Sequence, residues 1–343
     1  MKIKTLMDFL SKESNYPESE REATTRQSGT SSQHEENVVY IENARLETAG
    51  EQHHGNALLA SSTQWADSAM GEILVELEKL RFEDVDRIID YQREKGLYFG
   101  EAAVELKLVR QEDILHALST QFGYSYNPNE ELLSKDTVMA YSPFGEQAEE
   151  FRSLRSHLLS GWLAPDRKTL AVVSPENQEG RSYVASNLAL AFSQSGHSTL
   201  LIDADMRAPR QHEIFNFRRR LGLSMLLAGR VKVEDLDMLP DQVSSFRHLS
   251  VLACGALPPN PAELLSRGTF PRILRELEKF FDVIIIDTPP AKYKADLVSI
   301  AAVAGSALLV TRAGRSRMDA TKHLISNLSD IKAKVVGAVL NQF

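Results

Sequence analysis

From about residue 129 onward, short apolar runs alternate with longer helical patterns. Apolar runs of this length are typical of strands buried on both faces, and they lie at 170–174, 199–202, 248–252, 281–287, 306–310 and 335–340. Val184, Leu188 and Phe192 mark the apolar face of a helix between the first two runs. Strands alternating with helices predict an α/β fold over residues 129–343, with a parallel sheet covered by helices on both faces.

The region before this fold has a different composition. Residues 13–67 are rich in Ser, Thr, Glu, Gln and Asn, so they cannot bury enough apolar area to offset their chain entropy. The pattern predicts a disordered tail over residues 1–67. Within 68–128, Glu83-Asp84-Val85 recurs 29 positions later as Glu112-Asp113-Ile114, and Gly71 recurs as Gly100. Each copy predicts a short helix, a turn and a longer amphipathic helix, which together indicate a small helical repeat domain.

The loop after the first strand, residues 175–182, leads directly into a helix. Strand, loop and helix in this order place the N–H groups of 178–183 at a helix N-terminus, where free donors and the helix dipole favour a phosphate. The loop only partly matches G-x-x-x-x-G-K-[ST], because Gly180 and Ser182 fit while Arg181 replaces the Lys. Gln178 lies where related loops carry Gly, at a position that can require a positive φ. By this motif alone, a polar loop at a helix N-terminus remains an alternative.

Acidic residues end two of the predicted strands. Asp203 and Asp205 follow one strand and Asp287 follows another, and the carboxyl ends of parallel strands meet at the edge where open α/β sheets bind ligands. Three carboxylates beside a phosphate loop supply oxygen ligands for Mg²⁺, directly or through water. Together they favour a nucleotide site over helix caps or solvated acids.

Charge and cysteine content exclude other classes. A net charge of −8 and a pI near 5.7 argue against nucleic acid as a partner. The single cysteine, Cys254, excludes an internal disulfide framework and fits a reducing compartment. We expect it to be a small core residue.

Several of these motifs resemble those of one family. Residues 202–209 and 286–290 are similar to the second and third nucleotide motifs of the bacterial tyrosine kinases of exopolysaccharide and capsule synthesis, including the EpsG-like chain-length-determinant kinases. Glu149, Arg152 and Arg155 match the family's E-x-x-R-x-x-R, and 337–341 matches its closing strand. The resemblance implies a P-loop NTPase fold like those of MinD and these kinases, the cofactors ATP and Mg²⁺, and phosphoryl transfer to tyrosine.

The resemblance also implies roles for particular residues. Asp203 would accept the tyrosine proton and Arg181 would supply positive charge. Mg²⁺ would be held by Ser182, Asp205 and Asp287. The nucleotide contacts implied are Gln178, Glu179, Gly180, Arg181, Ser182, Tyr183 and Asn341, and the implied subunit contacts of a homo-oligomer are Glu149, Arg152 and Arg155.

The family further implies a partner, an inner-membrane chain-length-determinant protein of the Wzz-like kind. No run approaches the roughly 20 apolar residues that span a bilayer, so we expect a cytoplasmic protein that reaches the inner membrane through this partner. Besides Arg181 and Gln178 in the loop, the chain departs from the family in its tyrosines, since its last tyrosine is Tyr293 and no C-terminal tyrosine cluster follows. Candidate acceptors are Tyr16 and Tyr40, or a tyrosine of a partner. The alternatives are a non-catalytic adaptor that uses ATP to set its oligomeric state, and a MinD-like positioning ATPase, which is weakened because the phosphate loop lacks a second Lys.

The helical repeat resembles the N-terminal (MshEN-like) domain of type II secretion ATPases. Some of these domains bind cyclic di-GMP through two copies of R-L-G-x-x-[LVI]-[LVI]-x-x-G. Gly71 and Gly100 match this motif, but Ala69 and Tyr98 replace its arginines, and Glu78 and Lys107 replace its later glycines. Because neither Ala nor Tyr supplies the charge that grips a phosphate, the sequence disfavours cyclic di-GMP and favours a protein-docking role.

Overall fold

The structure, a computed structural model, describes residues 2–4, 70–121, 133–217, 221–231, 240–243 and 245–342. The disordered tail predicted at 1–67, with Tyr16 and Tyr40, lies outside the described residues except at 2–4, where the chain forms a strand instead because it pairs with the edge of the sheet. Among those described, we find no helix with both the length and the apolar character needed to cross a bilayer.

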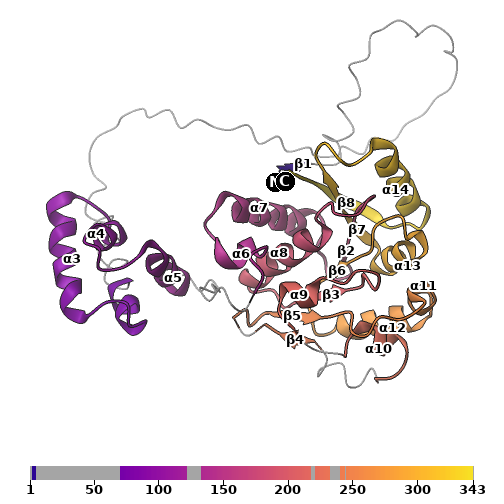
Figure 1. The fold of residues 1–343 in the computed structure, drawn as a ribbon, viewed down its shortest axis with the longest axis horizontal. Helices are drawn as coiled ribbons and strands as arrows, with labels where there is room; N and C mark the ends of the chain where they lie inside the picture. Colours follow the sequence, from indigo (N-terminus) through magenta and orange to yellow (C-terminus); the bar gives the residue numbers. More distant parts are fainter. Residues whose placement is uncertain are drawn as a thin grey trace, which may run out of the picture.

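Residues 2–4 join the C-terminal part in one eight-stranded sheet with the order β1-β8-β7-β2-β6-β3-β5-β4 (Figure 1). Neighbouring strands from β8 to β5 run parallel, while β1 pairs antiparallel with β8 at one edge and β4 pairs antiparallel with β5 at the other. The parallel sheet predicted from the apolar runs is therefore confirmed. Its strands are β1 (Lys2–Lys4), β2 (Thr169–Val173), β3 (Thr199–Asp203), β4 (Asp241–Gln242), β5 (Leu249–Leu252), β6 (Val283–Asp287), β7 (Ser306–Arg312) and β8 (Lys334–Asn341).

Successive side chains of the central strands enter two separate cores. Leu170 and Val172 of β2 join the core beneath α7 and α8, whereas Ala171 and Val173 join the core beneath α12, α13 and α14. Both faces of the sheet are thus covered, as the continuous apolar runs predict. The helices of this part are α6 (Val138–Tyr141), α7 (Glu146–Gly161), α8 (Arg181–Gln194), α9 (Gln211–Ile214), α10 (Leu223–Leu227), α11 (Pro261–Leu265), α12 (Thr269–Leu277), α13 (Lys294–Ala304) and α14 (Met318–Asp330).

Some elements cannot be read from the apolar pattern. Helix α7 begins at Glu146, with Gly145 as its N-cap, because residues 143 and 144 form a turn after the short helix α6. The edge strands β1 and β4 contain three and two residues, too few for an apolar pattern to reveal them. Cys254 is buried, as expected of a core residue.

The backbone of residues 70–121 repeats at the 29-residue spacing seen in the sequence. A helix at 70–76 and α3 (Phe82–Lys95) form the first unit, and α4 (Phe99–Glu105) and α5 (Gln111–Gln121) form the second. A Cβ added at Gly71 would lie 3.1 Å from Val85, and one at Gly100 would lie 3.0 Å from Ile114, so the same close packing occurs twice.

The turns of the two units also correspond. Glu78 and Lys107, the positions where the resembling motif has its later glycines, both have φ of 57°. This left-handed conformation explains why the resembling motif has glycine at these two positions, because glycine alone adopts it without a steric cost.

Candidate functional site

The loop between β2 and α8 contains two residues in the left-handed conformation, separated by one residue. Gly180, the N-cap of α8, has φ of 93°, and Gln178 has φ of 60°. The expectation that position 178 requires a positive φ is therefore confirmed, although a side chain is present there. Such a conformation costs a non-glycine residue roughly 1–2 kcal/mol, so other contacts must hold it.

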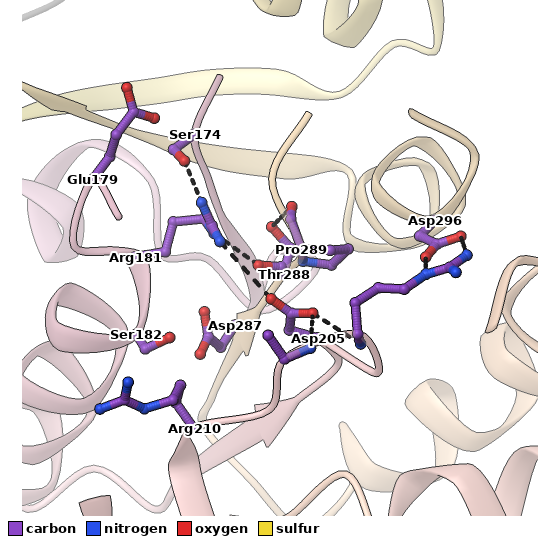
Figure 2. A network of polar contacts seen from close by, with 12 residues as sticks. Ser174, Glu179, Arg181, Ser182, Asp205, Arg210, Asp287, Thr288, Pro289 and Asp296 are labelled. Carbon is purple, nitrogen blue, oxygen red and sulfur yellow. Dashed lines mark hydrogen bonds and ion pairs between the residues drawn. The ribbon is translucent and has the colours of Figure 1, made fainter. Parts of the chain in front are cut away.

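The guanidinium of Arg181 is held by polar groups around the loop. It turns back beneath the loop (Figure 2). Nε donates to the carbonyl of Thr288 at 2.8 Å, and Nη1 donates to Ser174 Oγ at 2.5 Å and to the carbonyl of Glu176 at 2.8 Å. The positive charge that the resemblance implies for Arg181 at the phosphates stays a prediction. The planar fork, with five donors, satisfies several acceptors here that a Lys ammonium could not reach together.

The same guanidinium faces the acids of the site. Nη2 lies 3.8 Å from Asp205 Oδ2, and both side chains are buried. Burial lowers the pKa of Arg181, while the charges of Asp287, Asp205 and Glu179 oppose that change. Arg181 thus acts as an internal counter-charge to the acidic cluster.

Asp203 and Asp287 are neighbours in the register of β3 and β6, and both are fully buried. Asp203 Oδ2 accepts the N–H groups of Arg210 and Gln211, each at 3.0 Å. Burial, followed by the charge of Asp287, raises the pKa of Asp203 well above its usual range. Burial also raises the pKa of Asp287, against the opposing effects of Arg181 and hydrogen bonds from Ser182 and Gln211. The two carboxyls therefore resist being ionised together.

The polar atoms at this point fit a divalent cation. Asp203 Oδ1, Asp287 Oδ1 and Gln211 Oε1 are buried without a hydrogen-bond partner. Within the described part of the chain, however, no three His, Cys, Asp or Glu side chains group closely enough to hold a metal ion by themselves. Such a site suits Mg²⁺, which keeps several waters and takes phosphate oxygens, with Ser182 and the acids completing the shell.

Gln211 is a site residue that the sequence analysis missed. Its Nε2 donates to Asp287 Oδ2 at 2.8 Å and to the carbonyl of Ser182 at 3.2 Å, and its main-chain N–H donates to Asp203 Oδ2. It therefore joins the ends of β3 and β6 to the first turn of α8. A Gln eight residues after Asp203 has no motif that would single it out.

Glu179 is fully buried inside the phosphate loop. Its Oε2 accepts the N–H of Glu176 at 2.7 Å, its Oε1 accepts the hydroxyl of Ser316, and its carbonyl accepts Asn341 Nδ2 at 2.7 Å. The resemblance implied nucleotide contacts for Glu179 and Asn341. The structure brings both residues to the loop, where the bonds just described hold the loop itself.

A cleft of about 480 Å³ opens in front of the loop. Ser182, Asp205 and Arg210 line it, together with the other predicted loop residues Gln178, Glu179, Gly180, Arg181 and Tyr183. A second hollow of about 460 Å³ adjoins it, because Asp136 and Tyr183 line both, and Asn341 lines the second. Burial, with the charges of Asp136 and Glu150, raises the pKa of Tyr183 to about 12.

The E-x-x-R-x-x-R residues contact their own chain. Arg152 Nε donates to Glu149 at 2.8 Å, and its Nη1 donates to the carbonyl of Pro143 at 2.5 Å. Arg155 Nη1 donates to the carbonyl of Ala191 in α8 at 3.0 Å. A subunit contact at these residues stays a prediction, and the most exposed of the three for such a contact is Glu149.

A parallel sheet, a phosphate loop at a helix N-terminus and acids at the adjoining strand ends define a P-loop NTPase. Residues 167–342 match the ParA family model, described as NUBPL iron-transfer P-loop NTPase. CapB of Staphylococcus aureus, named as a candidate tyrosine-protein kinase, is 34% identical over 195 residues, which is 57% of this chain and 84% of CapB. The tyrosine-protein kinase YwqD of Bacillus subtilis is 32% identical over 209 residues, 61% of this chain and 86% of YwqD.

A solved structure supports the same relationship. The kinase domain of the Escherichia coli tyrosine kinase ETK superposes with a TM-score of 0.57 at 28% identity, covering 60% of this chain and 79% of that domain. The chain belongs to the ParA group of P-loop NTPases and, within it, to the bacterial tyrosine-protein kinases.

Proposed function

We propose that this chain binds ATP and transfers its γ-phosphoryl group to tyrosine, as the kinase component of a system that polymerises and exports exopolysaccharide. The observation that carries the proposal is the position of Ser182 and Asp205 at the phosphate-loop cleft, with the buried Asp287 accepting a hydrogen bond from Ser182. Membership of the tyrosine-kinase family supports the choice of acceptor. The inner-membrane chain-length-determinant partner, the cytoplasmic location beside it and a homo-oligomer are part of the same proposal.

Residues of this chain have distinct roles in the transfer. The tyrosine oxygen attacks the γ-phosphorus, the bond to the bridging oxygen breaks, and ADP leaves with that electron pair. Asp203 accepts the tyrosine proton, and its raised pKa makes it a stronger base than an exposed carboxylate. Ser182 would hold Mg²⁺, with Asp205 and Asp287 acting through its waters, and the bound ion would neutralise phosphate charge.

Two measurements on the purified chain test this proposal. Calorimetry with ADP and Mg²⁺ should give a micromolar-range dissociation constant, about −8 kcal/mol, and Asp205→Asn should weaken binding more in Mg²⁺ than in EDTA. Asp319→Asn, an exposed acid at the start of α14, is the matched control and should bind normally. Absence of any nucleotide affinity would overturn the site.

Phosphotyrosine mass spectrometry after incubation with Mg-ATP then separates the two functional classes. A kinase accumulates phosphotyrosine that the Asp203→Asn variant lacks. Tight nucleotide binding with no phosphotyrosine, with or without the membrane partner, would instead indicate the adaptor whose oligomeric state follows its nucleotide.

A further inference from the structure

The left-handed conformation of Gln178 is held by two arginines from a distant part of the chain. Arg315 Nη2 donates to the side-chain Oε1 of Gln178 at 3.0 Å, and Arg312 Nη1 donates to the main-chain carbonyl of Gln178 at 3.3 Å. Arg312 ends β7 and Arg315 lies in the turn before α14. Both the side chain and the backbone of Gln178 are therefore fixed from one direction.

The same turn holds the next residue of the loop. The hydroxyl of Ser316 donates to the buried carboxylate of Glu179, and the Ser316 Oγ itself accepts the N–H of Arg312 at 2.7 Å. Residues 312–316 and residues 178–179 thus meet at three points. None of residues 312–316 lines the cleft in front of the loop, so this turn supports the loop from outside the cleft.

We propose that residues 312–316 are a positioning element for the nucleotide, in which Arg315 holds Gln178 in the left-handed conformation that the phosphate loop requires. The proposal rests on nucleotide binding at this loop. A glycine at 178 would adopt the left-handed conformation unaided, whereas a glutamine needs contacts from other residues to stabilise it. Arg315 is a positioning residue, since it acts on the phosphates only through the shape of the loop.

Removing the Arg315 side chain should weaken nucleotide binding by a measurable amount. Without Arg315, Gln178 can leave the left-handed region and turn loop N–H groups away from the phosphates. We expect Arg315→Ala to raise the dissociation constant of Mg-ADP about tenfold, which corresponds to about 1.4 kcal/mol. That value matches the usual penalty of a left-handed non-glycine residue. Arg317→Ala removes an exposed arginine two positions along and is the matched control, with an expected change below twofold.

A double variant separates positioning from simple charge. Gln178→Gly needs no hold, so Arg315→Ala should have little effect in the Gln178→Gly background, and the double variant should bind ADP within about threefold of Gln178→Gly alone. If Arg315 instead attracted phosphate through its charge, the tenfold loss would persist in that background. Persistence of the loss, or an Arg315→Ala affinity equal to that of wild type, would overturn the proposal.

A measurement without nucleotide keeps this proposal distinct from the proposed function. Hydrogen exchange of the amides at 176–180 should accelerate in ligand-free Arg315→Ala and remain at the wild-type rate in Arg317→Ala. Unchanged exchange in Arg315→Ala refutes the hold even if ADP binds. Accelerated exchange in a chain that binds no ADP would preserve the hold and refute only the nucleotide site. Melting temperatures of both variants should match wild type, because each side chain is exposed.

Discussion

Replacing Arg181 with Lys tests what the buried guanidinium does. Arg181 makes three hydrogen bonds that join the loop at 174–176 to Thr288. A Lys ammonium has three donors but lacks the spread of the planar guanidinium fork, so we expect about two of these bonds to be lost. At about 1 kcal/mol net for each bond, the domain should lose about 2 kcal/mol of stability. For a domain of this size, that loss lowers the melting temperature by about 4–8 °C.

The same substitution should favour phosphoryl transfer. A Lys ammonium can place its point charge at the β- and γ-phosphates, whereas the guanidinium is held by the carbonyls of Thr288 and Glu176. We expect Arg181→Lys to raise the rate of phosphotyrosine formation while the ADP dissociation constant stays within a few-fold. Thermal unfolding without nucleotide and quantitative mass spectrometry with Mg-ATP measure the two effects on one preparation.

The two readouts can refute the reasoning separately. An unchanged melting temperature would show that the guanidinium bonds do not support the loop. A rate equal to or below that of wild type, in a less stable variant, would show that the loop has adapted to arginine. Arg210→Lys is the control. Arg210 lines the cleft, and its side chain forms an ion pair with the exposed Glu213, so the melting temperature of this variant should not change.

Three further outcomes follow from the site and from the helical repeat. Asp203→Asn removes an ionisable carboxyl from a buried acidic pair, so the ligand-free protein should gain about 1–3 kcal/mol in urea unfolding at pH 7 while phosphotyrosine formation is lost. Since the pKa of Asp203 is raised in the fold, the folded state holds a proton that the unfolded state releases, and wild-type stability should fall as pH rises from about 3.8 through the raised pKa. Urea unfolding across this pH range should show a shallower fall in Asp203→Asn, and an identical slope would contradict the assignment. Gly100→Val places a branched side chain against Ile114 and should destabilise the helical unit by about 1–3 kcal/mol, seen as faster proteolysis of residues 70–121 in the full chain. Gly96→Val is the comparison: its side chain would meet no neighbour, but its φ is positive, so it shows the effect of backbone strain without crowding. Titration of the full chain with cyclic di-GMP should show no saturable binding below about 10 µM, the range of an intact site, and saturation there would reveal contacts other than the two missing arginines.

The strands and the acids could be predicted because local pattern determines them. Residues 283–286 form a continuous apolar run, so they lie in a strand buried on both faces, and Asp287 then ends that strand at the ligand edge. The left-handed backbone at position 178 also follows from the loop pattern.

The direction of Arg181 and the role of Gln211 could not be predicted in the same way. Arg181 reaches an acceptor 107 positions along the chain, and Arg315 reaches one 137 positions away. Such contacts depend on side-chain rotamers and on how the strands are ordered in the sheet. A loop acid next to a phosphate site would ordinarily face solvent, but Glu179 is buried because the hydroxyl of Ser316, the N–H of Glu176 and the charge of Arg181 compensate its carboxylate.

The ends of the sheet limit how copies of this chain can associate. Unpaired backbone groups on a long edge strand are a template for joining two sheets into one. Here the described sheet ends in β1, with three residues, and β4, with two, and each runs antiparallel to its neighbour. So short an edge offers few free N–H and C=O groups, and extending the sheet across two copies would gain little. Assembly of this chain should therefore proceed through helical faces, and a continuous intermolecular sheet would require β1 or β4 to detach first.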